Sequence, residues 1–311
     1  METIVLRPTG VMQFERCAEA YRLSTVLGIR TATTSHALAM GKAGHKSILP
    51  FVAAHAAGEA IDPVPLFRQA WQEQLDTHVI RFTKHSAKEL EEIGSKLTAA
   101  FPDVWASSGL TAVVAKGTVL VENRLRVAIE PGLVLSGEPD IVASRGNQSG
   151  GGLAIPDAKF ASGSAFDGFA RVSDQLTAYQ LLVRFNAGTL GLADRPVSEL
   201  GFIEGVKNKE PRWTMQFAAA RDDTSLGAYV EKLKMTAALI RKGYFPKRSG
   251  NAFESPCGEC DFRQLCLDRN PEGYTSAYGD VMDLVEGRSE PRRRGKVSQV
   301  IVDRPEDAEA A

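Results

Sequence analysis

Two stretches of the sequence place an acidic side chain directly after an apolar run. Asp157 and Lys159 follow "GLAIP", and Asp140 follows "LVLSGEP". Residues two apart on a β-strand face the same side of a sheet, so the Asp157 carboxylate and the Lys159 ammonium should share a face. If a turn joins two neighbouring strands, which lie about 4.8 Å apart, Asp140 and Asp157 converge on one point.

This arrangement predicts metal-dependent phosphodiester hydrolysis. Two carboxylates and a main-chain carbonyl, here that of Ala158, suit a hard divalent cation such as Mg²⁺ or Mn²⁺. Such an ion polarises a phosphoryl oxygen and lowers the pKa of a bound water. A lysine beside it can orient that water or stabilise the transition state. The alternative is a solvated ion pair at a strand end, which is common and weak, and the two stretches alone favour neither interpretation.

Other polar residues are candidates for the same site. Gln175 and Tyr179 are four apart and share one helix face, from which they can brace the acids or reach a phosphate; alternatively, Tyr179 is a half-buried core aromatic and Gln175 is merely exposed. His45 in "GKAGHKSIL" offers a neutral imidazole as a further metal ligand, although a lone histidine is more often no ligand at all. Glu122 and Glu130 are weaker candidates as extra acids.

The four cysteines form one candidate ligand set. Cys257, Cys260 and Cys266 lie close together in "CGECDFRQLC", and the fourth cysteine, Cys17, lies far upstream. The C-x-x-C spacing is typical of Zn²⁺ and iron–sulfur sites, and spacing alone does not separate the two. The alternative is unrelated buried thiols. Ligation by all four would join the N-terminal and C-terminal segments.

The elements that must position these residues can be read from periodicity. Helices are predicted over residues 9–27, 36–57, 65–82, 86–101, 171–188 and 224–245. Strands are predicted over residues 112–129, 133–144, 153–162 and 199–206, with a turn over 145–152. Ser86 and Glu89 form a capping box, Gly188 is a predicted helix cap, and Pro156 favours an edge strand or a strand start. The order indicates an α/β or α+β domain around one central mixed sheet.

Composition sets outer limits. The chain has 311 residues, 43% apolar and 24% charged, with a formal net charge of −1. This length fits one large domain or two small ones, and the near-zero charge requires any nucleic-acid surface to be local. No basic, apolar leader opens the chain and no apolar run approaches the ~20 residues of a membrane span. A cytoplasmic protein without disulfides is therefore expected.

A local basic surface is predicted over residues 205–248. That segment contains ten basic and four acidic residues, a net charge of +6, with Trp213 and Phe217 interleaved. Such a segment suits a DNA strand, with the aromatics available for base stacking. The alternative is an ordinary solvated face with core aromatics. The charged tail, residues 285–311, is expected to be disordered.

Taken in order, these elements resemble the RecB-like nucleases of the PD-(D/E)XK superfamily, especially the subgroup with a cysteine-ligated iron–sulfur cluster. That subgroup includes nuclease domains of helicase–nuclease complexes and CRISPR-associated and phage exonucleases. The matching residues are, in chain order, Cys17, His45, Asp140 in "GEPD", Asp157 and Lys159 in "DAK", Gln175 and Tyr179 as Gln-x-x-x-Tyr, and Cys257, Cys260 and Cys266. Asp157 stands where many members have Glu.

The resemblance implies a restriction-endonuclease-like fold, in which helices flank a mixed central sheet and a four-cysteine cluster joins the N- and C-terminal segments. Residues 1–284 would form the nuclease domain. The implied activity is Mg²⁺- or Mn²⁺-dependent cleavage of DNA, commonly exonucleolytic, in recombination, repair or phage DNA processing, with a recombination or helicase protein as partner. The alternative is a catalytically inactive DNA-binding or scaffold subunit of the same fold, against which the intact Asp140, Asp157 and Lys159 argue.

The resemblance also implies residue roles. It makes Asp140, Asp157 and Lys159 catalytic. The implied metal ligands are His45, Asp140, Asp157 and the Ala158 carbonyl. Gln175 and Tyr179 would support the site or contact DNA. The four cysteines would hold a structural 4Fe–4S cluster in preference to Zn²⁺.

Overall fold

The structure is a computed structural model that describes residues 3–145, 151–208, 210–248, 250 and 254–290. Its chain forms two compact units. The first comprises residues up to 15 and residues 33–244, and the second comprises residues 16–32 and those from 245 onward. Whether residues 1–284 act as one nuclease domain stays a prediction. Part of the predicted turn (146–150) and most of the predicted tail (291–311) lie outside the described residues.

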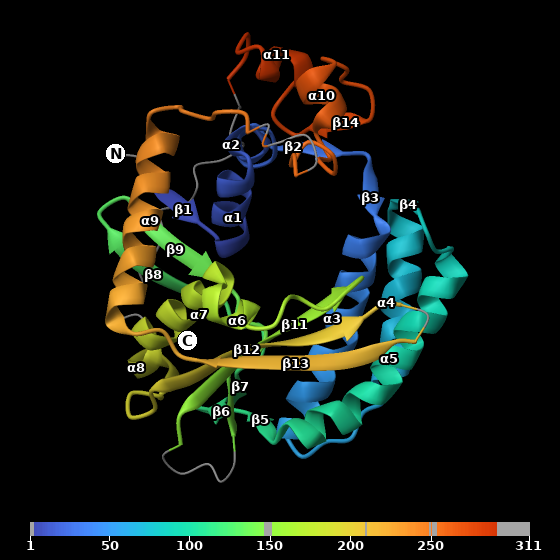
Figure 1. Ribbon diagram of the computed structural model, residues 1–311, viewed down its shortest axis with the longest axis vertical. Helices are drawn as coiled ribbons and strands as arrows, with labels where there is room; N and C mark the ends of the chain where they lie inside the picture. The colour runs from blue at the N-terminus through green and yellow to red at the C-terminus, as the bar shows by residue number, and fades with distance from the viewer. Residues whose placement is uncertain (1–2, 146–150, 209, 249, 251–253, 291–311) are drawn as a thin grey trace. The chain divides into compact units, whose positions relative to one another are not determined.

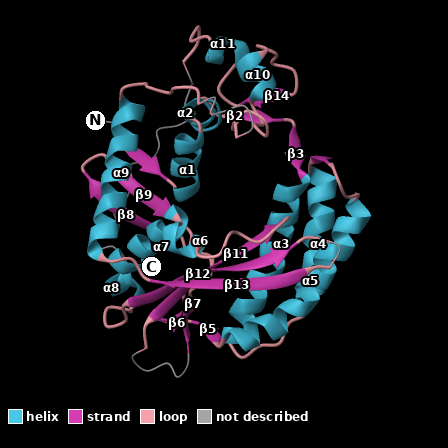
Figure 2. Cartoon of the chain, in the orientation of Figure 1, coloured by secondary structure: helices cyan, strands magenta, loops and turns pink. Residues whose placement is uncertain are grey.

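A five-stranded mixed sheet forms the centre of the first unit (Figures 1 and 2). Its order is β13-β12-β11-β10-β5, where β11 and β12 are parallel and the other neighbours are antiparallel. The bounds are β5 (Leu110–Ala112), β10 (Ala143–Arg145), β11 (Leu153–Ala161), β12 (Val197–Val206) and β13 (Arg212–Ala219). The mixed α/β fold is therefore confirmed, with β11 at the middle of the sheet.

Two predictions about the strands are wrong in an instructive way. The predicted strand 133–144 is divided into β9 (Leu133–Gly137) and β10, which belong to different sheets, so Asp140 lies in the connection between them. Pro139 has no N–H to contribute to a ladder, which favours the break. Pro156 lies inside the central strand β11 rather than at an edge. On the flank facing β10 the ladder has already ended at Ala154, so Pro156 interrupts nothing there.

The region 112–129 also forms several short strands. They are the end of β5, β6 (Val114–Ala115), β7 (Thr118–Val119) and β8 (Leu125–Glu130). Lys116 and Gly117 adopt φ values of 49° and 77°, which produce a tight hairpin between β6 and β7. β8 pairs with β9, and β9 pairs in parallel with β1 (Ile4–Leu6), which completes a separate three-stranded sheet.

Two helices, α3 (His36–Ala56) and α5 (Ala87–Ser108), cover one face of the central sheet, and a third, α4 (Pro63–Thr77), packs against both of them (Figure 1). The predicted capping box of Ser86 and Glu89 is present, but α5 runs through Pro102 to a left-handed Gly109. After α4 the chain becomes β4 (Val79–Arg81), which pairs with β3 (Thr33–Ser35). Gly44 of α3 lies directly against the Phe160 ring of β11, so helix and sheet are in close contact.

The other face is covered by α7 (Asp174–Phe185), which also packs on the three-stranded sheet. The predicted helix 171–188 is divided into α6 (Phe169–Val172), α7 and α8 (Ala187–Leu190). Gly188 is inside α8 and is not its cap. Asn186 ends α7 by donating its side-chain amide to the Leu182 carbonyl, and Gly191 caps α8. Among the described residues the last long helix is α9 (Asp223–Arg241), with Asp222 as its N-cap.

Strand β13 is absent from the sequence prediction, which assigns its residues to a basic DNA-binding surface. Trp213 of β13 packs between Phe101 and Phe160 and donates its indole N–H to the Leu97 carbonyl at 2.8 Å. Phe217 of the same strand packs against the core, and the Arg145 guanidinium lies over its ring. These two aromatics are partly buried and pack on the core of the sheet.

The second unit combines residues 16–32 with the C-terminal segment. The predicted helix 9–27 breaks at Cys17, whose extended backbone (φ −164°) separates α1 (Pro8–Arg16) from α2 (Ala18–Tyr21), which continues as the π-helical turn η1 (Arg22–Val26). Strand β2 (Ile29–Thr31) then pairs with β14 (Tyr274–Ser276). Two short helices, α10 (Arg263–Leu267) and α11 (Val281–Val285), pack with η1 around a small apolar core.

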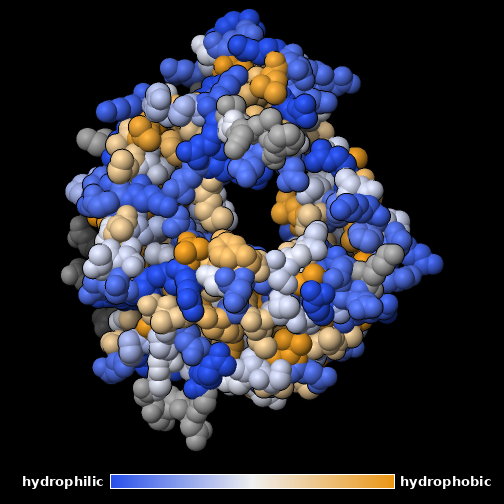
Figure 3. All heavy atoms as spheres, viewed as in Figure 1, coloured by the Kyte–Doolittle hydropathy of each residue, from blue (hydrophilic) through white to orange (hydrophobic). Residues whose placement is uncertain are grey.

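Surface character agrees with the composition. The face seen in Figure 3 is mostly hydrophilic, with apolar residues in separate small groups. Within the described part of the chain, no helix combines the length and apolarity that crossing a membrane requires.

Candidate active site

Strand β11 places Asp157 and Lys159 on one face, as their spacing predicts. The Asp157 side chain is buried, whereas the Lys159 side chain is 37% exposed, and its Nζ lies 2.5 Å from Asp157 Oδ2. Burial alone would lower the pKa of Lys159, but the nearby carboxylates of Asp157 and Asp140 outweigh it, so the pKa is raised. The amine is therefore a charged ammonium that reaches solvent beside a buried acid.

Asp140 reaches the same strand from its connection. Its Oδ2 accepts the Ala158 N–H at 2.8 Å. Burial raises the pKa of Asp140 well above its usual range, and the neighbouring Asp157 carboxylate raises it further. Two buried acids therefore lie close enough to repel each other, and a positive charge between them would relieve this repulsion.

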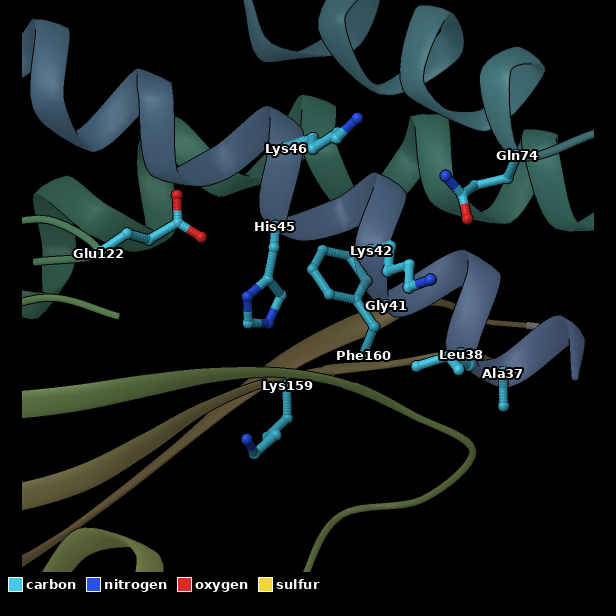
Figure 4. Close-up of a pocket in the computed structure, with 10 residues that line it drawn as sticks. All are labelled: Ala37, Leu38, Gly41, Lys42, His45, Lys46, Gln74, Glu122, Lys159 and Phe160. Carbon is cyan, nitrogen blue, oxygen red and sulfur yellow. The ribbon is translucent and has the colours of Figure 1, made fainter. Parts of the chain in front are cut away.

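His45 approaches β11 from α3. Its Nε2 donates to the Ala158 carbonyl at 2.9 Å, and its Nδ1 lies 3.7 Å from Asp140 Oδ1. Burial lowers the pKa of His45, so the imidazole is neutral near pH 7. Figure 4 shows the ring directed from α3 toward β11, while Lys159 points to the opposite side of the strand.

Helix α7 supplies the third side of the arrangement. Gln175 donates from Nε2 to Asp157 Oδ1 at 3.1 Å and to the Tyr179 hydroxyl at 2.9 Å. Burial raises the pKa of Tyr179, and Asp157 adds to the shift, so the phenol stays protonated. The structure thus brings together all seven predicted residues of this group: His45, Asp140, Asp157, Ala158, Lys159, Gln175 and Tyr179.

One acid of this region escaped the sequence prediction. Glu204 on β12 is the cross-strand neighbour of Lys159 and is buried. A glutamate inside the apolar run "GFIEGV" is the signal that marks it. Of the weaker candidates, Glu122 is close enough to influence the pKa values of Asp140 and His45, whereas Glu130 forms an ion pair with Arg241.

The donor atoms of this group are of the types that bind a divalent metal, but the side chains that carry them are in contact with one another. Carboxylate oxygens of Asp140 and Asp157 and the Ala158 carbonyl are the ligands that Mg²⁺ and Mn²⁺ prefer. One Asp157 oxygen is engaged by Lys159, and the Ala158 carbonyl is engaged by His45. Across the described residues, no three side chains of His, Cys, Asp or Glu are set as a ready metal-binding group. Binding an ion here requires these short contacts to open.

A cavity of about 630 Å³ lies beside the site, on the α3 side of β11 (Figure 4). Its lining includes three lysines and the buried Gln74; in full it is formed by Ala37, Leu38, Gly41, Lys42, His45, Lys46, Gln74, Glu122, Lys159 and Phe160. Lys46 pairs with Glu73. The cavity therefore adjoins the α3 side of β11, next to His45.

All four cysteines lie in the second unit. Each is half-buried and carries a free thiol. Burial raises the pKa of Cys260, and the other three cysteines add to the shift. Cys17, Cys260 and Cys266 pack against the apolar core of this unit. The structure thus gathers the predicted set, without the tight spacing of a formed metal site among the residues it describes.

Comparison with known proteins agrees with this geometry. Residues 6–267 match the PD-(D/E)XK nuclease superfamily. No curated protein matches the chain significantly. Among solved structures, a candidate exonuclease from Eubacterium rectale aligns with 91% of this chain and 93% of its own, at 17% identity and a TM-score of 0.45.

Two further structures are of the enzyme LHK-Exo. Its complex with dAMP aligns with 67% of this chain and 92% of its own, at 11% identity and a TM-score of 0.25. The alkaline exonuclease LHK-Exo from Laribacter hongkongensis aligns with 69% and 94%, at 12% identity and a TM-score of 0.24. These scores are low, so the assignment rests on the superfamily match.

Proposed function

The chain belongs to the PD-(D/E)XK nuclease superfamily, and we propose that it is a divalent-metal-dependent deoxyribonuclease that acts as an exonuclease. One observation carries the proposal. Asp140, Asp157 and Lys159 come from two separate segments and meet around Ala158, at the middle of the central sheet. A surface ion pair would not require a second, buried acid at the same point.

The proposed roles follow from exposure and charge. Lys159 is the catalytic lysine, because its ammonium is charged and accessible while its partner Asp157 is buried. In that position it can orient a water or stabilise negative charge that develops on a phosphate. Gln175 fixes the Asp157 carboxylate through one hydrogen bond, and Tyr179 in turn holds Gln175. These two residues therefore position the acid.

The proposed metal ligands are Asp140, Asp157, the Ala158 carbonyl and His45. A bound Mg²⁺ or Mn²⁺ would polarise the phosphoryl oxygen and lower the pKa of its water. The chain prepares this chemistry by keeping His45 neutral, with a nitrogen able to coordinate. Lys159 would release its contact with Asp157 and turn toward the phosphate.

The finer assignment follows the resemblance to the RecB-like, iron–sulfur subgroup. We propose a structural 4Fe–4S cluster on Cys17, Cys257, Cys260 and Cys266, with Zn²⁺ as the less favoured occupant. Their gathering in one unit supports this, because β2 and β14 bring the two ends of the chain together there. A role in recombination, repair or phage DNA processing, a helicase or recombination partner, and a cytoplasmic location are proposed on the same basis.

Cleavage of end-labelled DNA with Mg²⁺ or Mn²⁺ tests the activity. The wild type should release short products, and Lys159→Ala should lose at least about 100-fold in rate, the effect typical of removing one group that stabilises transition-state charge. Lys88→Ala is the matched control, because Lys88 is exposed at the start of α5. Equal rates for Lys159→Ala and wild type would refute the assignment. Retained DNA binding with no cleavage under either metal would favour the inactive scaffold.

Metal analysis of the purified protein tests the cysteine site. Iron with absorbance near 400 nm is expected for an iron–sulfur cluster, and Cys260→Ala should abolish both signals. Zinc without this absorbance would assign Zn²⁺ to the four thiols. If protein purified without oxygen contains no iron and no zinc, the proposal that the four cysteines bind a metal is contradicted.

A further inference from the structure

The loop that follows β11 presents an aromatic side chain to solvent close to the proposed active site. Residues 162–168 connect β11 to α6, and Phe166 within them is 64% exposed. Most phenylalanines of this unit behave differently: Phe67 and Phe101, for example, are fully buried. An exposed aromatic near a catalytic lysine is a candidate for contact with substrate.

The loop is tied to the sheet on both sides of Phe166. Glu204 of β12 accepts the Ala165 N–H at 3.0 Å, and Gln216 of β13 accepts the Ala170 N–H at 3.1 Å. Gln216 in turn contacts Glu204 at 3.4 Å. The backbone on either side of the aromatic is thus held by buried or half-buried side chains of two strands.

The Phe166 side chain packs against a neighbouring aromatic ring. Phe169 stacks on Phe202 of β12, with ring centres 5.5 Å apart and planes at 18°. Phe166 meets Phe169 nearly at right angles, with centres 5.3 Å apart. This contact occupies only one side of Phe166. Phe166 remains 64% exposed, and Phe169 and Phe202 connect it to the sheet.

The same hydrogen bonds place Phe166 near Lys159. Glu204 is the cross-strand partner of Lys159, and the residue it binds, Ala165, directly precedes Phe166. Since adjacent strands lie about 4.8 Å apart, the aromatic and the ammonium belong to one local surface. A DNA strand whose phosphate lies at Lys159 would bring its neighbouring base to this loop.

The charge of the loop favours contact with a base over contact with a phosphate. Asp167 in the loop and Arg171 in α6 are both exposed and of opposite sign, so the loop and the helix after it carry no positive charge in excess to attract a backbone. An aromatic face offers stacking to any base, with little dependence on sequence. Stacking requires a base face that is not already covered by its neighbour.

We propose that Phe166 is a stacking platform for an unpaired nucleobase of the DNA strand in the active site. The inference rests on the proposed nuclease function and narrows its substrate class to single-stranded DNA or a frayed duplex end. Phe166 thereby determines specificity for unpaired DNA, whereas Glu204 and Gln216 position the loop that carries it.

Three variants test the platform: Phe166→Ala, Phe166→Trp, and Phe185→Ala as the matched control. Phe185 is also 64% exposed in the same unit, but it ends α7, away from the loop. The probe is a short single-stranded oligodeoxynucleotide that carries 2-aminopurine, titrated in EDTA to prevent cleavage. Phe166→Ala should weaken binding by between about 5-fold and about 100-fold, the range found when a stacking aromatic is removed. It should also abolish the fluorescence quenching that stacking causes.

The tryptophan variant and the control separate stacking from a loss of structure. Phe166→Trp should restore affinity and quenching, and Phe185→Ala should match the wild type in both. In cleavage assays Phe166→Ala should raise KM on single-stranded DNA with little change in kcat. If Phe166→Ala binds and quenches like the wild type while the wild type cleaves DNA, the platform is refuted and the nuclease assignment stands. A wild type that neither binds nor cleaves DNA would overturn both.

Discussion

The contact between Gly44 of α3 and Phe160 of β11 determines how closely His45 approaches the sheet. A Cβ atom at Gly44 would lie 2.2 Å, 2.4 Å and 2.5 Å from three carbons of the Phe160 ring. Such distances are impossible, so Gly44→Ala must push the helix and the strand apart. Gly41, one turn earlier in the same helix, has no atom within 4 Å of the position that a Cβ would take, and it serves as the matched control.

The size of the effect follows from two opposing terms. In a helix, alanine is favoured over glycine by about 1 kcal/mol, so Gly41→Ala should raise the free energy of unfolding by about that amount. Gly44→Ala gains the same propensity but overpacks the core, which typically destabilises by about 1–3 kcal/mol. The two variants should therefore differ in unfolding free energy by about 1–3 kcal/mol, with Gly44→Ala the less stable.

Gly44→Ala should also lower the nuclease activity. The 2.9 Å contact between His45 Nε2 and the Ala158 carbonyl depends on the close approach of α3. A displacement of about 1 Å in a catalytic arrangement can lower the rate by about 100-fold, so Gly44→Ala should lose nuclease activity even where it remains folded. Phe160→Leu in the Gly44→Ala background should recover part of both losses, because the smaller side chain accepts the methyl group.

Urea unfolding and DNA cleavage, measured on the same preparations, provide the test. The two single glycine variants give the difference in stability, and a double-mutant cycle between positions 44 and 160 gives the coupling. If Gly44→Ala stabilises the protein as much as Gly41→Ala does, α3 does not pack on Phe160 as described. If the stability changes caused by the substitutions at positions 44 and 160 simply add, the same conclusion follows.

Two further predictions concern α7 and α5. Gln175→Leu removes the hydrogen bond that fixes Asp157, which we propose as a metal ligand. Activity should fall by about 10- to 100-fold, the effect typical of losing a residue that orients a ligand; an unchanged rate would remove Gln175 from the proposed site. Ser86→Ala deletes an N-cap and should destabilise by about 1 kcal/mol in urea, whereas Ser107→Ala in the same helix should stay within about 0.5 kcal/mol of wild type. Hydrogen bonds from Ser86 lower the pKa of Glu89, so the stabilisation by Glu89 is present above the ordinary glutamate pKa and should disappear as the pH falls through the lowered value.

Local spacing predicted those features that local spacing determines. Asp157 and Lys159 share a face because side chains alternate along a strand, and Gln175 and Tyr179 share one because of the helical repeat. The capping box at Ser86 is likewise a short-range feature. Each of these arrangements is set within a single strand or helical turn, so it depends little on which distant segments pack against it.

The features that sequence alone did not reveal depend on distant partners. Whether residues 133–144 form one strand or two depends on which sheet each half joins. In the structure the two halves belong to different sheets. Trp213 looked available for DNA because the helix and strand that enclose it are distant in sequence. Glu204 was overlooked because its importance comes from register with Lys159 across two strands.

The site itself depends on the point at which β10 ends. The main-chain N–H and C=O groups of alternate residues along a strand point to the same flank. The main-chain groups of Pro156 and Ala158 therefore face the flank of β11 along which β10 no longer pairs. Proline has no N–H to leave unsatisfied there. The Ala158 N–H is taken by Asp140 and its carbonyl by His45, so both groups that a neighbouring strand would have paired are available to side chains from distant segments. A longer β10 that continued the ladder past Ala154 would satisfy the backbone but close this flank. The early end of β10 is therefore what allows a buried, central strand to carry the catalytic site that we propose.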